Sequence, residues 1–166
     1  VSVDNEVMQL SAQAKNLNPK VIKLALIAYH NAVKQGVTQK KYLTIVDDSL
    51  PATERRLWVF DLENNKMLFN ELVAHGKCSG DNQLISFSND PSSNKSSIGL
   101  FVTGDTYSGK HGYSLRLNGM EQGFNSNAKE RAVVMHSANY VNDNIAKTGR
   151  LGRSLGCLAL DPAVSK

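Results

Sequence analysis

The hydrophobic pattern of this chain changes its period after residue 40, and this change constrains the fold more than any other feature. After residue 40, short runs rich in β-branched and aromatic residues alternate with segments of Asn, Gly, Ser and Pro. The runs are residues 42–46, 56–62, 66–74, 98–104, 113–119 and 131–138. Short runs of this composition between turn-forming residues are typical of β-strands. We predict a mainly β fold, a mixed sheet or sandwich, behind an N-terminal α-helical segment.

The helical segment has recognisable ends. Asn18 is a suitable N-cap, Pro19 fits the first helical position, where an N–H is not needed, and Gly36 is a suitable end. Apolar residues at helical spacing form one face, which consists of Val21, Leu24, Ala25, Ala28 and Ala32. A helix buries a stripe of this kind against a sheet. We therefore predict a helix over residues 18–35.

Two polar segments interrupt the predicted strands. Asn64 and Asn65 lie between two apolar runs and tolerate positive φ, which indicates a β-hairpin turn. Residues 87–97 are rich in Ser and Asn but continue directly into an apolar run, so we predict a long surface loop inside a domain. We divide the chain into a helical segment, residues 1–38, packed on a domain of residues 39–166.

Length and composition exclude several classes of protein. A chain of 166 residues suits one domain with a sizeable core. The longest apolar run, residues 24–29, is far shorter than the roughly 20 residues that cross a bilayer, so we expect no transmembrane segment. Basic residues occur singly or in pairs without interleaved aromatics, which argues against nucleic acid. We expect a monomer, and the first residue, Val rather than Met, fits removal of a signal peptide.

The stretch GRSLGC, residues 152–157, has the composition of a nucleophile turn. Thiol catalysis needs a thiolate, a base that generates it, and donors for the oxyanion of the tetrahedral intermediate. A glycine before the cysteine allows a sharp turn, in which the main-chain amides of Leu155, Gly156 and Cys157 can point at one oxygen. The alternative is an ordinary buried cysteine without a catalytic role.

His136 is the strongest candidate for the base among the four histidines. It ends the apolar run AVVM, which would hold it rigidly, and it precedes Cys157 by 21 residues. A strand, a polar loop and a return would bring the two side chains together. A thiolate paired with an imidazolium would be alkylated by iodoacetamide even below about pH 7. A cysteine and a histidine at this separation also occur in proteins without such chemistry.

The detailed pattern resembles a known family. VVMHSA followed by GRLGRSLGC is similar to the L,D-transpeptidase catalytic domain of the YkuD type, with its strand-end His, variable loop and Ser-x-Gly-Cys. The resemblance covers about residues 40 to 160 and points to a murein L,D-transpeptidase-like branch. Further segments match in order: HGKCSG, FSNDPSSNKSSIGLFVTGDTY, GKHGYSLRLNGMEQGFN and RAVVMHSANYV.

The resemblance implies an enzyme of the bacterial cell envelope or periplasm that acts on peptidoglycan stem peptides without a cofactor. Cys157 would attack the carbonyl between an L-centre and a D-amino acid and form a thioester. An acceptor amine or water would then resolve it, giving transpeptidase or carboxypeptidase activity. His136 would transfer the proton. β-Lactams of the carbapenem type are the expected acylating inhibitors.

The resemblance also suggests roles for residues around this pair. Ser137 would orient the histidine through its main-chain carbonyl, and Ser154 would shape the turn. Arg153 and Arg150 are candidates for a substrate carboxylate, because guanidinium binds that group with two parallel bonds. Either arginine would equally suit a surface position.

The chain departs from the common family pattern at two positions. Many members have Ser-His-Gly-Cys followed by an arginine two residues after the cysteine, whereas this chain has Leu155 and Ala159. Leu155 offers only an amide, and a substrate carboxylate would need another partner, which makes Arg153 more attractive. The family pattern also leads us to expect one more strand after the cysteine strand, which is consistent with a C-terminal truncation of the chain.

Two other segments contain a histidine next to residues that invite a functional role. His111 lies in a glycine-rich segment near Tyr107, and we predict that both line the substrate cleft. His75 and Cys78 are spaced i and i+3, but two ligands without partners predict no metal site. Cys78 and Cys157 make no disulfide framework.

Two functions of other classes compete with the enzyme. One is a catalytically silent peptidoglycan-binding module that keeps the cleft, which the Leu155 substitution favours. The other is a generic cysteine hydrolase on another acyl substrate, since a thiol and an imidazole do not define the acyl group.

Overall fold

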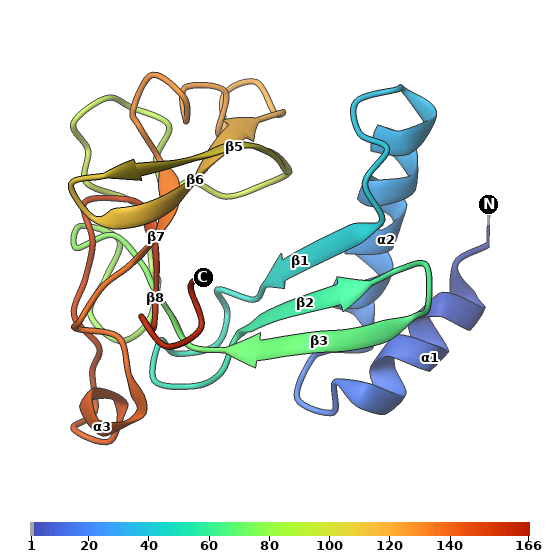
Figure 1. Cartoon of the computed structure of the whole chain (residues 1–166), viewed down its shortest axis with the longest axis horizontal. Helices are drawn as coiled ribbons and strands as arrows, with labels where there is room; N and C mark the ends of the chain where they lie inside the picture. Colours follow the sequence, from blue (N-terminus) through green and yellow to red (C-terminus); the bar gives the residue numbers. More distant parts are fainter. Residues whose placement is uncertain (1) are drawn as a thin grey trace. The chain divides into compact units, whose positions relative to one another are not determined.

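The computed structural model describes residues 2–166, which form helices and two β-sheets (Figure 1). The contacts divide them into two compact units. The first comprises the described residues up to Asp47 together with Arg56–Glu71, and the second comprises Asp48–Arg55 together with Leu72–Lys166. The helical segment that we predicted ends at residue 38, whereas the first unit also contains a three-stranded sheet.

The first unit packs two helices with an antiparallel sheet of order β1-β2-β3. Its elements are α1 (Asp4–Gln13), α2 (Pro19–Lys34), β1 (Tyr42–Val46), β2 (Leu57–Asp61) and β3 (Lys66–Glu71). Helix α1 contacts α2 and β3, and α2 contacts β1 (Figure 1). The largest fully buried apolar side chains here are Trp58, Phe60, Leu10, Ile22 and Leu26.

The predicted helix and hairpin of this unit are confirmed, but the predicted helix face is wrong: α2 buries Ile22, Leu26 and Ala32, and Leu24 is 69% exposed. The Asn18 side chain accepts a hydrogen bond of 2.9 Å from the amide of Lys20, and Pro19 is the first residue of α2. Strands β2 and β3 pair antiparallel, and Asn65 in their connection has φ of 49°. Helix α1 was not predicted, because it has no side-chain cap and few apolar residues besides the buried Leu10.

The second unit contains a mixed sheet of order β4-β8-β7-β6-β5. Its elements are β4 (Val73–Ala74), β5 (Phe101–Gly109), β6 (Gly112–Gly119), β7 (Val134–Ser137), α3 (Asp143–Ala146) and β8 (Leu158–Leu160). All neighbours pair antiparallel except β7 and β8, which pair parallel. The predicted mainly β fold with a mixed sheet and N-terminal helices is confirmed.

The parallel pair has a direct consequence for the chain path. Parallel neighbours cannot be joined by a tight turn, so the chain leaves the end of β7 and returns through residues 138–157 to start β8 alongside it. Buried residues of this crossover, Val141 and Leu151, pack with Ala52, Leu72, Ala74 and Ala159. This core anchors the segment that precedes Cys157.

One predicted run divides between the two sheets. Residues 66–74 were predicted as one strand, but Leu72 interrupts it, and β3 and β4 belong to different sheets. Among the helices of residues 2–166, none combines the length and apolar composition that a bilayer span requires.

Candidate active site

The register of β7 and β8 brings Cys157 next to His136. Met135 lies opposite Leu158 and His136 lies opposite Ala159, so one step further back Cys157 lies opposite Val134. In agreement, the main-chain amide of Val134 faces the Cys157 thiol. Alternate residues of a strand share a face, which makes Cys157 and His136 diagonal neighbours on one face of the sheet.

The thiol of Cys157 is partly buried against the segment that leads into β7. Its Sγ donates a hydrogen bond of 3.5 Å to the carbonyl of Ala132, a residue held at φ of 54°. Burial raises the pKa of the Cys157 thiol, and the amide of Val134 and the guanidinium of Arg131 oppose this rise. The raised pKa keeps the resting nucleophile a neutral thiol near neutral pH.

His136 is 4% exposed and is held in one tautomer. Its Nδ1 lies 2.8 Å from the carbonyl oxygen of Ser137. A carbonyl only accepts hydrogen bonds, so Nδ1 carries the hydrogen and Nε2 keeps a lone pair for a proton. Burial lowers the pKa of His136, the Ser137 carbonyl opposes this, and His111 lowers it further. A neutral imidazole can accept the proton of the thiol.

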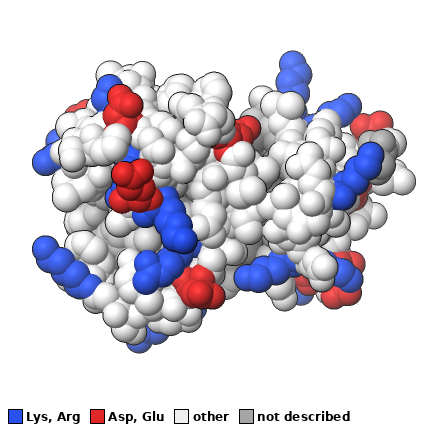
Figure 2. Space-filling model, turned by 90° about the horizontal axis from the view of Figure 1, so that it is seen from above, with Lys and Arg blue, Asp and Glu red and all other residues white. Residues whose placement is uncertain are grey.

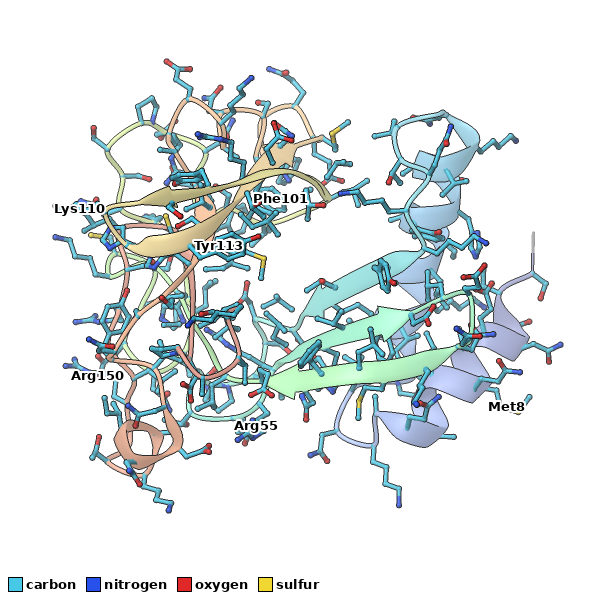
Figure 3. All side chains as sticks on the ribbon, viewed as in Figure 1. Met8, Arg55, Phe101, Lys110, Tyr113 and Arg150 are labelled. Atoms are coloured by element: carbon cyan, nitrogen blue, oxygen red, sulfur yellow. The ribbon has the colours of Figure 1, made fainter. Side chains whose placement is uncertain are left out.

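His111 lies in the turn between β5 and β6 and stacks on the base. The rings of His111 and His136 are 4.5 Å apart and inclined by 20°. Lys110, labelled in Figure 3, forms this turn together with His111, and Tyr113, also labelled, follows in β6. The carbonyl of His111 also accepts a long hydrogen bond, 3.5 Å, from the Ser137 hydroxyl. His111, predicted to line a cleft, therefore packs directly against the base.

Ser154 holds the nucleophile turn together from inside. Its buried hydroxyl donates a 2.6 Å hydrogen bond to the carbonyl of Cys157 and accepts one of 3.1 Å from the amide of Gly156. The Gly156 amide is thus directed at Ser154, which departs from its predicted role as an oxyanion donor. The other two predicted donors, the amides of Leu155 and Cys157, make no such hydrogen bond to the Ser154 hydroxyl. The Leu155 side chain is 66% exposed.

Gly156 is required for the shape of this turn. Its φ is 125°, a conformation that side chains other than glycine rarely adopt. A Cβ at this position would lie 2.9 Å from the carbonyl oxygen of Lys95 and 3.3 Å from the Arg131 guanidinium. The turn at Gly156 therefore leaves no room for a side chain on the side of Lys95 and Arg131.

The two arginines predicted to bind a substrate carboxylate both face a carboxylate of the chain itself. Arg150 Nη1 lies 2.7 Å from Asp81 Oδ1, and Arg153 Nη1 lies 3.7 Å from the same oxygen. Arg153 also donates to the carbonyls of Lys77 and Gly80, each at 3.2 Å. These contacts fasten the segment before Cys157 to the turn after β4, and they give both arginines a structural partner.

Tyr107 has a partner on the neighbouring strand. The guanidinium of Arg116 on β6 lies 4.1 Å from the centre of the Tyr107 ring. A cation over an aromatic face is attracted to it, which orients the ring. On the face drawn in Figure 2, basic and acidic side chains are interspersed rather than gathered by sign.

Two residues near the nucleophile were not predicted. Burial raises the pKa of the Tyr140 hydroxyl, and the charge of Cys157 adds to this rise, so the ring lies within electrostatic reach of the sulfur. Arg131 is the other. Tyr140 follows His136 by four residues, and this spacing predicts no contact with Cys157 unless the crossover is known. Arg131 stands beside Lys129 and Glu130, so its sequence context predicts an ordinary surface charge.

His75 and Cys78, spaced i and i+3, each have surroundings that the structure describes. His75 Nε2 lies 3.2 Å from the carbonyl of Gly80, and Cys78 and Cys157 are both free thiols. Within residues 2–166 no three side chains of His, Cys, Asp or Glu gather as metal ligands would.

Comparison with known proteins identifies the family. The profile of the L,D-transpeptidase catalytic domain matches residues 13–166, nearly the whole chain. Neither a curated protein nor a solved structure gives a significant match. The strand-end histidine, the serine-supported turn and the free thiol described above lie within the matched residues. The chain belongs to the L,D-transpeptidase catalytic domain family, which consists of cysteine-dependent enzymes.

Proposed function

We propose that this protein transfers acyl groups of peptidoglycan stem peptides through a thioester on Cys157, as an L,D-transpeptidase or L,D-carboxypeptidase. The observation that carries the proposal is the parallel register of β7 and β8, which makes Cys157 and His136 diagonal neighbours on one face of the sheet. The family membership supplies the substrate class. For a protein that acts on this substrate, we propose a location in the envelope or periplasm of a bacterium.

The first half-reaction forms the acyl-enzyme. Nε2 of His136 takes the proton from the Cys157 thiol as sulfur attacks the carbonyl carbon of the L-centre. The amides of Leu155 and Cys157 donate to the oxyanion, where preorganised donors act strongly. When the intermediate collapses, the C–N bond breaks and His136 returns its proton to the leaving D-amino acid. The product is a thioester and a free amine.

The second half-reaction regenerates the thiol. An amine of a neighbouring stem, or water, attacks the thioester carbonyl and loses a proton to His136. The C–S bond then breaks, and the sulfur receives that proton. Transfer to an amine gives a cross-link or an exchanged stem, and transfer to water gives hydrolysis.

The resting protonation states suit this sequence. Burial raises the pKa of Cys157 and lowers the pKa of His136, so the free enzyme holds a neutral thiol beside a neutral imidazole. The proton therefore moves when the acyl carbonyl arrives, as it does for a serine nucleophile with a histidine base. Leu155, where many family members have histidine, is the feature that favours the alternative of a silent peptidoglycan-binding module.

The test uses a purified disaccharide tetrapeptide with a second D-amino acid as acceptor, analysed by mass spectrometry. The proposal predicts loss of the terminal D-alanine, with the acceptor incorporated by a transpeptidase or water by a carboxypeptidase. The variant C157A should do neither. Binding of the tetrapeptide without turnover would support the binding module, and turnover of unrelated thioesters or amides alone would support a generic cysteine hydrolase.

A further inference from the structure

Arg131 fastens a long polar loop next to the nucleophile turn. Its Nη1 donates to the carbonyl of Ser88 at 2.7 Å and to the hydroxyl of Ser97 at 2.6 Å. Its Nη2 donates to the hydroxyl of Ser93 at 3.1 Å and to the carbonyl of Lys95 at 2.7 Å. One guanidinium thus binds four residues of the loop 88–97, which otherwise has little regular structure.

The same guanidinium lies beside the nucleophile. A Cβ on Gly156, the residue before Cys157, would lie 3.3 Å from Arg131 Nη2. On the other side, the carbonyl of Ala132, the residue after Arg131, accepts the hydrogen bond from Cys157 Sγ. Arg131 is therefore linked to Cys157 in two ways: its guanidinium lies beside Gly156, and the residue that follows it, Ala132, accepts the bond from the thiol.

The charge of Arg131 is not neutralised by its hydrogen bonds. All four of its bonds end on neutral oxygens, two carbonyls and two hydroxyls. Burial lowers the pKa of Arg131, and the charges of Cys157 and Asp90 oppose this. Tyr140 and His136, neutral in the resting state, are the other titratable groups that face Cys157. A partly desolvated cation next to a thiol favours the anion that forms there.

We propose that Arg131 is a positioning residue for Cys157: it stabilises the thiolate as a fixed cation and fastens the loop 88–97 behind the turn at Gly156. The first role needs only the charge, whereas the second needs the planar fork of guanidinium, which lysine does not reproduce. This inference rests on the proposed role of Cys157 as nucleophile, but the thiol pKa is measurable without any peptidoglycan substrate. A failure of the inference is therefore distinct from a failure of the proposed function.

The test measures the apparent pKa of Cys157 from iodoacetamide alkylation rates, followed by intact mass, in a C78A background that leaves one thiol. In R131M the apparent pKa should rise by about one unit, so that alkylation at about pH 7.5 falls about tenfold. In R131K, which keeps the cation, it should stay within about half a unit of the parent value. The exposed Lys129 in the same turn gives the matched control, K129M, which should behave as the parent.

Hydrogen exchange of residues 88–97 reports the second role. Exchange should be faster in both R131M and R131K, because both lose the guanidinium that makes the four hydrogen bonds to this loop. If Arg131 had only a structural role, exchange would be faster in both variants and the thiol pKa would be unchanged in both. That result overturns the cation role. Equal pKa rises in R131M and R131K overturn it as well, and unchanged exchange in both overturns the fastening role.

A variant that keeps Arg131 covers the case in which R131M does not fold. The double variant S93A/S97A removes two acceptors and leaves the cation in place. It should exchange faster over residues 88–97 while the apparent pKa of Cys157 stays within about half a unit. A rise of a full unit in S93A/S97A or in R131K would show that the loop, and not the charge, sets the thiol pKa.

Discussion

The ring of His111 stacks on the ring of His136 at a centroid distance of 4.5 Å, so the candidate base is covered by a second imidazole. This stacking excludes water from one face of His136, and a protonated His111 would repel a proton on its neighbour. Burial, the Ser137 carbonyl and His111 together set the pKa of His136, with burial the largest influence and His111 acting to lower it. His111 therefore lowers the pKa of the candidate base, His136.

Removing His111 should raise the pKa of His136. H111F keeps a stacked ring without the charge, so we expect a rise of less than about one unit. H111A also exposes the ring to water and should give the larger rise. NMR titration of the His136 ring protons measures both. An unchanged or lower pKa in H111A would contradict this account of the base.

The Ser154 hydroxyl should matter for both stability and acylation. S154A deletes the bond to the Cys157 carbonyl and leaves the Gly156 amide without its partner. Losing a buried, bonded hydroxyl costs about 1–3 kcal/mol of unfolding free energy, measured by denaturant titration. Acylation by a thioester substrate should slow in parallel. The same change at exposed Ser108, S108A, should alter neither, and an S154A enzyme with unchanged stability would contradict the assigned bonds.

Two glycines with similar backbone angles should respond differently to alanine. Gly156 and Gly149 have φ of 125° and 100°, but a Cβ on Gly156 meets Lys95 and Arg131, whereas one on Gly149 meets nothing within 4 Å. G149A should cost about 1 kcal/mol of unfolding free energy and leave acylation unchanged. G156A should displace the turn and slow acylation about 100-fold. Equal effects of the two substitutions on acylation would show that crowding at Gly156 does not position the nucleophile.

The pH dependence of alkylation should exclude a resting ion pair. The pKa of Cys157 is raised and the pKa of His136 is lowered, the reverse of the order that a thiolate–imidazolium pair needs. Below its pKa the thiolate fraction falls tenfold per pH unit, so iodoacetamide should modify Cys157 in C78A more slowly than free glutathione at about pH 7. Alkylation that persists at about pH 6 would indicate an ion pair.

Much of the fold was predictable because the relevant signals are local. The cap at Asn18 and the turn at Asn65 are properties of neighbouring residues, and both are seen in the structure. The strand-end position of His136 followed from the apolar run before it. Helix α1 escaped prediction because its support is tertiary: Leu10 is fully buried, but no cap marks where the helix begins.

The partners of the arginines were not predictable, because they depend on contacts far apart in sequence. Arg150 pairs with Asp81, 69 residues away, a partner within the chain that the sequence did not suggest. Arg131 binds loop residues 34 to 43 positions away. Charge spacing along the chain contains no information on either, since Arg150 is brought to its partner by the crossover between β7 and β8, and Arg131 lies in the segment that leads into β7.

The most direct measurement is the intact mass of the protein after exposure to a carbapenem, whose strained ring opens on attack and adds its whole mass. Wild-type protein and C78A should each gain one inhibitor mass, and C157A should gain none. H136Q should gain it much more slowly, by about 100-fold or more, because the thiol then lacks its base. A wild-type protein that keeps a reduced Cys157 and gains no mass, or an adduct that persists in C157A, would contradict acyl transfer through this thiol.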